Sequence, residues 1–86
     1  MVTEHFRVLI SRQEDMFVAQ CLEHDVAVQA PDLETLERRF DATIAAESAD
    51  GSLASIPPAP AQFHEIWDQA AELTGHFPHS QSRVAA

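Results

Sequence analysis

Apolar and polar side chains alternate along the first thirty residues of the chain. The alternation has a period of two residues, which is typical of β-strands, and it runs through residues 5–11, 16–22 and 26–30. Placing Ser11 opposite Met16 across a four-residue loop, and Val28 opposite Ala19, gathers the apolar positions on one face. We therefore predict a three-stranded antiparallel sheet. Its apolar face includes Phe6, Val8, Phe17 and Val28.

The apolar spacing changes to three and four residues after Pro31. Asp32 is suited to cap the start of a helix, and Gly51 is suited to follow a helix that ends near Ala49. Between them one apolar stripe is formed by Leu33, Leu36, Phe40 and Ile44. We predict that this helix covers the apolar face of the sheet.

A second helical pattern follows a proline-rich segment. Three prolines exclude a helix between 50 and 60, where residues 53–56 could form a short fourth strand. Helical spacing returns over 61–73, and no periodicity is left beyond Gly75. The pattern predicts a single α+β domain over 1–75, in the order strand, strand, strand, helix, with a second C-terminal helix. Residues 76–86 are predicted to be a flexible tail.

The second helix carries an apolar stripe of its own, formed by Phe63, Ile66 and Trp67. A chain of 86 residues has a thin core. The stripe could pack within the chain or against a second copy. Because the stripe and the second sheet face together exceed what one small core can use, we predict a homo-oligomer, most simply a dimer, with these three residues in its interface.

Composition narrows the classes of function. Five Arg and no Lys stand against fourteen Asp and Glu, a formal charge of −9, which disfavours direct binding of nucleic acid. No apolar run reaches the roughly 18 residues of a membrane span, so we expect a soluble cytoplasmic protein. The single cysteine, Cys21, excludes an internal disulfide, and its strand position predicts a core residue rather than a nucleophile beside His24. We expect no catalytic, cofactor or metal site, and no enzyme.

The run FVAQCLEHDVAVQAPDLETLERRFDATIA over residues 17–45 resembles the HicB antitoxin-like family, which has a partial RNase H-type fold. The matching features are an aromatic residue and Ala on the second strand, an acidic turn, a short third strand and a capped helix that begins with Leu. The acidic, proline-rich exit ADGSLASIPPAP extends the resemblance to about residue 60. The family's usual glycine before the helix is absent. Because the pattern after Pro60 predicts only one helix and a tail, we expect no C-terminal DNA-binding module, and the chain looks like a divergent, stand-alone relative.

The resemblance implies a protein-binding module that inhibits a small basic ribonuclease toxin. Such a partner would be steered by negative charge. An exposed edge of the first or third strand would suit an extended partner segment. The carboxylates expected around that edge are those of Glu23, Asp25, Asp32, Glu34 and Glu37. The alternative is a structural or regulatory homo-oligomer with no toxin partner.

Overall fold

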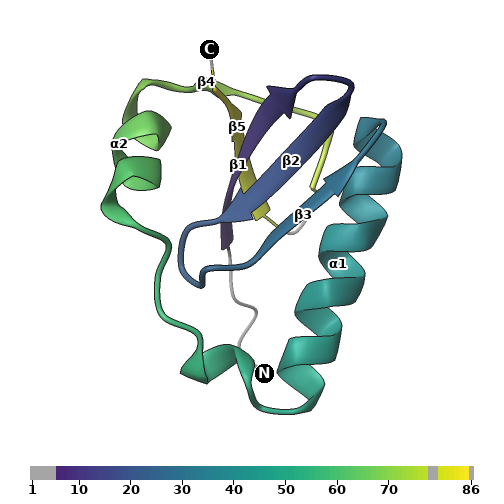
Figure 1. Ribbon diagram of the computed structural model, residues 1–86, viewed down its shortest axis with the longest axis vertical. Coiled ribbons are helices and arrows are strands. Elements are labelled where there is room, and N and C mark those ends of the chain that lie inside the picture. The colour runs from purple at the N-terminus through teal and green to yellow at the C-terminus, as the bar shows by residue number, and fades with distance from the viewer. Residues whose placement is uncertain (1–5, 78–79, 86) are drawn as a thin grey trace.

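The computed structural model describes residues 6–77 and 80–85, and it shows an α+β fold with one five-stranded mixed sheet and two α-helices (Figure 1). In chain order the elements are β1 (Phe6–Gln13), β2 (Met16–Cys21), β3 (Ala27–Ala30), α1 (Leu33–Ala49), the 3₁₀ helix η1 (Leu53–Ser55), α2 (Ala61–Gln69), β4 (Ala71–Glu72) and β5 (Ser80–Val84). Within these residues neither helix has the length and apolar character needed to cross a bilayer.

The strands lie in the order β3-β2-β1-β5-β4. The pairs β1–β2, β2–β3 and β4–β5 are antiparallel, whereas β5 runs parallel to β1. The predicted three-stranded sheet is therefore only part of the observed sheet. Two further strands from the last sixteen residues extend it beyond β1.

The first hairpin is two residues tighter than predicted. Met16 pairs with Gln13 and not with Ser11, so the loop is the pair Glu14–Asp15 and not four residues. Glu14 adopts a φ of 57°, the left-handed conformation that tight two-residue hairpin turns require. A shift of two residues keeps every side chain on its predicted face. The second predicted pairing, Ala19 with Val28, is confirmed.

α1 covers the predicted apolar face of the sheet. Val8 and Phe40 are almost completely buried between the sheet and α1, and Phe6, Phe17 and Val28 belong to the same cluster. This confirms both the assignment of faces and the helix that follows Asp32. Phe77 from the β4–β5 connection completes the cluster.

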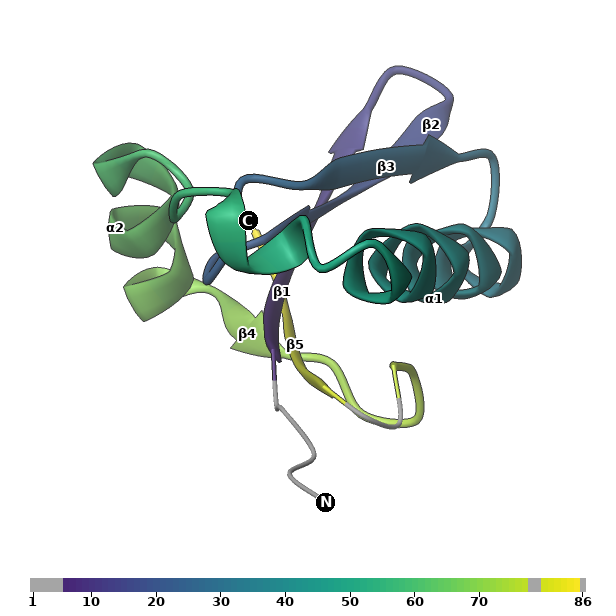
Figure 2. The same ribbon diagram turned by 90° about the horizontal axis from the view of Figure 1, so that it is seen from below.

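α2 lies on the other side of the sheet (Figure 2). Its Trp67 is 4% exposed and packs on Leu9 and Leu22, with Phe63 at the margin of this second cluster. The guanidinium of Arg83 lies 4.7 Å from the centre of the Trp67 ring. Most of the stripe assigned to an oligomer interface therefore packs within the chain, because α2 folds back over the second sheet face.

Two predicted elements differ from the observed ones. Residues 53–56 form η1 and not a short strand. α2 ends at Gln69, whereas the spacing predicted a helix to residue 73. The carbonyl of Trp67 accepts a hydrogen bond of 2.8 Å from Arg83, which satisfies one carbonyl of the last helical turn, and the chain continues as β4.

The predicted tail 76–86 is wrong for residues 80–84, because they form β5 between β1 and β4. Ser82 is 5% exposed, and its hydroxyl donates to the carbonyl of Leu73. The segment has almost no apolar alternation, since only Val84 is a large apolar residue. Its position depends on pairing with β1, a contact distant in sequence that periodicity does not reveal.

A chain that ends at Gly75 should lose its cooperative unfolding transition. It lacks β5, which pairs with five residues of β1, and Phe77 of the core. Urea unfolding followed by circular dichroism would test this, with Gln81→Ala at an exposed position of β5 as the control expected within about 0.5 kcal/mol of wild type. A truncated chain that unfolds with an unchanged midpoint would show that the tail is dispensable.

Trp67→Ala should lower the free energy of unfolding by about 3 to 5 kcal/mol, because it empties the cluster under α2. Ile66→Ala, at the neighbouring position that is 42% exposed, should have a much smaller effect. Unfolding at several protein concentrations checks the origin of the loss. A loss that depends on concentration would place Trp67 between copies of the chain and not within one.

Candidate functional site: the open edge of the sheet

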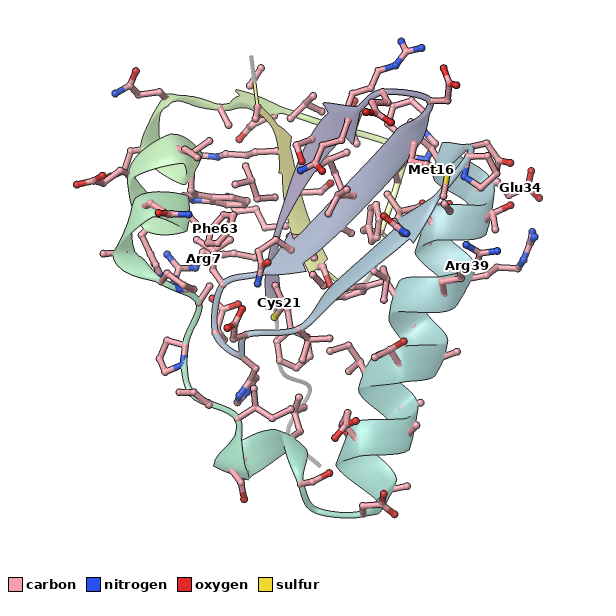
Figure 3. All side chains as sticks on the ribbon, in the orientation of Figure 1. Arg7, Met16, Cys21, Glu34, Arg39 and Phe63 are labelled. Atoms are coloured by element: carbon pink, nitrogen blue, oxygen red, sulfur yellow. The ribbon has the colours of Figure 1, made fainter. Side chains whose placement is uncertain are left out.

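The five carboxylates predicted to form one acidic site do not lie together. Glu23 and Asp25 precede β3, whereas Asp32, Glu34 and Glu37 follow it. β3 has four residues, so its length alone separates the groups by about 13 Å. Figure 3 shows Arg7, which pairs with Glu23, and Glu34 on opposite sides of the domain. The prediction of one concentrated acidic end was therefore wrong.

Glu23 is part of the internal structure of the first group. Its carboxylate accepts from the backbone N–H of Arg7 at 2.7 Å, and it forms an ion pair with the guanidinium of the same residue. These contacts fix the turn after β2 to the start of β1. A partner that used Glu23 would have to compete with them.

Asp25 is exposed, although its turn is fixed at several points. Its carboxylate accepts from the side-chain amide of Gln20 at 3.1 Å, and its own N–H donates to the carbonyl of Pro57 at 2.7 Å. Nearby, Nδ1 of His24 lies 3.0 Å from the carbonyl oxygen of Ile56. Asp25 is thus a well-positioned surface carboxylate.

Asp32 and Glu34 are both exposed at the start of α1. The side chain of Asp32 accepts from the N–H of Thr35 at 2.7 Å, and this hydrogen bond holds the pKa of the Asp32 carboxyl below its usual value. Glu34 forms only a loose pair of 3.5 Å with Arg38. Asp32 therefore has a structural role as helix cap, whereas the side chain of Glu34 is 84% exposed and holds no part of the fold together.

Glu37 connects α1 to the β4–β5 connection. Its carboxylate accepts from the N–H of Phe77 at 2.6 Å and lies 3.2 Å from Nδ1 of His76, within ion-pair distance but outside hydrogen-bond geometry. The ring of Phe77 packs edge-on against Phe40, with 5.7 Å between the ring centres. Glu37 therefore holds the buried Phe77 in the core and is not a free surface group.

Cys21 is fully buried in the core, as predicted. Burial raises the pKa of the thiol, and its sulfur lies 3.9 Å from a carboxylate oxygen of Glu23. Both features disfavour the thiolate that a nucleophile would need. Among the residues that the structure describes, no group of three or more His, Cys, Asp or Glu side chains could hold a metal ion.

β3 presents an open edge of the sheet. Of the two strands expected as candidates, β1 lies inside the sheet and β3 lies at its end, with no further strand of the described chain beside it. The N–H of Cys21 donates to the carbonyl of Val26, so hydrogen bonding alternates and the backbone groups of Val28 face β2. Those of Ala27 and Gln29 face outward.

A groove of about 570 Å³ runs beside this edge. It is lined by residues of β2, β3 and α1, namely Val18, Ala27, Val28, Gln29, Arg39, Ala42 and Thr43. Most of this lining is apolar or small, and Arg39 is its single charged residue. A row of outward-facing backbone groups beside apolar side chains is the arrangement to which an extended segment of another chain can add as a further strand.

Neither a family model, nor a curated protein, nor a solved structure matches this chain. Sequence reasoning pointed to an exposed strand edge but not to Arg39 or the groove, since both depend on how α1 lies against β3.

Asp32→Ala should destabilise the fold at neutral pH by removing the cap of α1. Because the pKa of Asp32 is lowered in the folded chain, its stabilisation is present above the unfolded-state pKa and is lost as pH falls through the folded-state pKa. Thermal unfolding between pH 7 and pH 2 should thus show the difference between wild type and variant shrinking with acid. Glu34→Ala is the control, and an equal loss in that variant would contradict a specific capping role.

Proposed function

We propose that this chain is a non-enzymatic, HicB-like protein-binding module that holds its partner at the open edge of β3. The observation that carries the proposal is the edge itself, with outward-facing backbone groups at Ala27 and Gln29 and an apolar groove along it. Backbone hydrogen bonds supply affinity in strand addition, and pockets for alternate side chains supply specificity.

The resemblance to HicB-like proteins supplies the class of partner, a small basic ribonuclease toxin that the chain would inhibit in the manner of an antitoxin. Three antiparallel strands followed by a covering helix support this, since that order is the one the resemblance implies. The charge of −9 favours fast association with a basic protein. Asp25, before β3, and Glu34, after it, are exposed and would be the first carboxylates that such a partner meets.

A structural or regulatory homo-oligomer is the second candidate, and one observation favours it. Ile66 is 42% exposed on α2, beside a second groove lined by Gln62, Glu65, Gln69 and Ala85. This surface lies on α2 and not at the β3 edge. A dimer formed through Ile66 would leave the β3 edge free, so the two candidates can be tested separately.

Ala27→Pro tests the proposed edge, because proline removes an outward-facing N–H while the pairing of β3 with β2 is kept. We expect the gene of a small basic ribonuclease to lie beside that of this chain, and the assay is inhibition of that enzyme, measured with purified proteins; a neighbourhood without such a gene would contradict the proposed partner class. We expect Ala27→Pro to weaken inhibition at least tenfold. An unaltered thermal midpoint would show that the fold is intact.

The matched control is Ala61→Pro, which makes the same substitution at the exposed first residue of α2, where proline is tolerated. It should inhibit like wild type. Equal inhibition by wild type and both variants would move the binding site away from β3.

A further inference from the structure

The edge of β3 carries one positive side chain in a protein that is otherwise strongly acidic. Arg39 projects from α1 beside β3, and its guanidinium donates to the outward carbonyl of Gln29 at 2.7 Å (Figure 3). This bond uses one of five guanidinium N–H groups. Arg39 is exposed, so the others are available to a ligand that enters the groove.

The neighbouring Arg38 is a natural contrast. It is also exposed on α1, but its guanidinium reaches Glu34 at 3.5 Å and the hydroxyl of Thr35 at 3.3 Å. Arg38 does not line the groove, whereas Arg39 does. The two arginines have the same charge and adjacent positions, and they differ in whether they face the β3 edge.

A strand added to β3 would place alternate side chains on the α1 side of the sheet, in the row of Val28. Those side chains would enter the groove between β3 and α1, where Arg39 is the charged group. A carboxylate in that row could pair with the guanidinium in a charge-assisted, two-point contact. A lysine there would face a like charge.

We propose that the segment recognised at β3 is an extended strand with an acidic side chain on its α1-facing side, and that Arg39 is the residue that selects it. This inference rests on the proposed function and names the chemistry of the segment bound. A partner of overall basic charge remains compatible with this proposal, because Arg39 would contact only one side chain of the bound strand. Overall charge guides the approach, and the local pair decides which strand fits.

A second copy of the chain is a poorer occupant of the same edge. In a symmetric pair the strand that it would offer is Ala27–Ala30, which contains no acidic residue to meet Arg39. The other edge strand, β4, contains Glu72 but has only two residues, too few to pair along β3. Two chains of charge −9 also repel each other. Charge complementarity thus favours a different protein with an acidic strand.

The test is an amide chemical-shift titration with two capped nine-residue peptides of alternating threonine and valine. One peptide has a central glutamate in a threonine position, and the other has lysine there. We expect the glutamate peptide to shift the amide signals of Ala27 and Gln29 and to bind up to about fivefold more tightly than the lysine peptide, the upper range for an exposed ion pair. Arg39→Glu should reverse that preference, and Arg38→Glu should leave it unchanged.

Several outcomes would overturn the inference. Equal binding of both peptides would show that the charge of the central side chain is not recognised. An equal effect of Arg38→Glu and Arg39→Glu would show that only net charge matters. No shift at Ala27 and Gln29 with either peptide would refute strand addition. Shifts at these amides that grow with protein concentration alone would assign the edge to a second copy. Failure of the proposed function itself would appear separately, as ribonuclease inhibition that is insensitive to Ala27→Pro.

Discussion

The parallel pairing of β5 with β1 is the constraint on which the rest of this structure depends. It joins residues 6–10 to residues 80–84, so the two ends of the described chain lie side by side in the sheet. It places β1 in the interior of the sheet, so that β3 and not β1 is an edge strand. The same pairing sets Arg83 beside Leu9 and so brings its guanidinium over Trp67.

Both faces of the sheet carry a cluster of buried apolar side chains. α1 covers one face through a large apolar cluster, and α2 covers part of the other through Leu9, Leu22 and Trp67. Polar side chains stabilise the packing on each face. Arg83 caps the end of α2, and Glu37 holds Phe77 against Phe40. Removal of the Glu37 contact would leave the buried N–H of Phe77 unsatisfied, which costs more than the bond itself contributes, whereas the carbonyl of Trp67 also accepts from the N–H of Ala70.

The five acidic residues predicted to bind a partner divide into two groups with different roles. Three of them each accept a hydrogen bond from a backbone N–H. Glu23 holds the turn after β2, Asp32 caps the start of α1, and Glu37 holds Phe77 in the core. Asp25 and Glu34 are exposed and are free to act on a partner through their charge. Charge content alone thus overstates the negative surface available for binding. The β3 edge depends instead on backbone groups and on one arginine.

The sequence by itself determined the elements whose signals are local. Alternation over residues 5–30 revealed the three antiparallel strands and their faces, and Asp32 with its apolar stripe revealed α1, because periodicity and capping act between near neighbours. The local pattern could not distinguish pairing of Met16 with Ser11 from pairing with Gln13, because both registers bury the same face of the hairpin. Only the tertiary structure decided the place of β5, whose polar sequence is stabilised by pairing with a strand some seventy residues away. The candidate site was decided in the same way, because Arg39 and Gln29 become neighbours only when α1 packs back against the edge of β3.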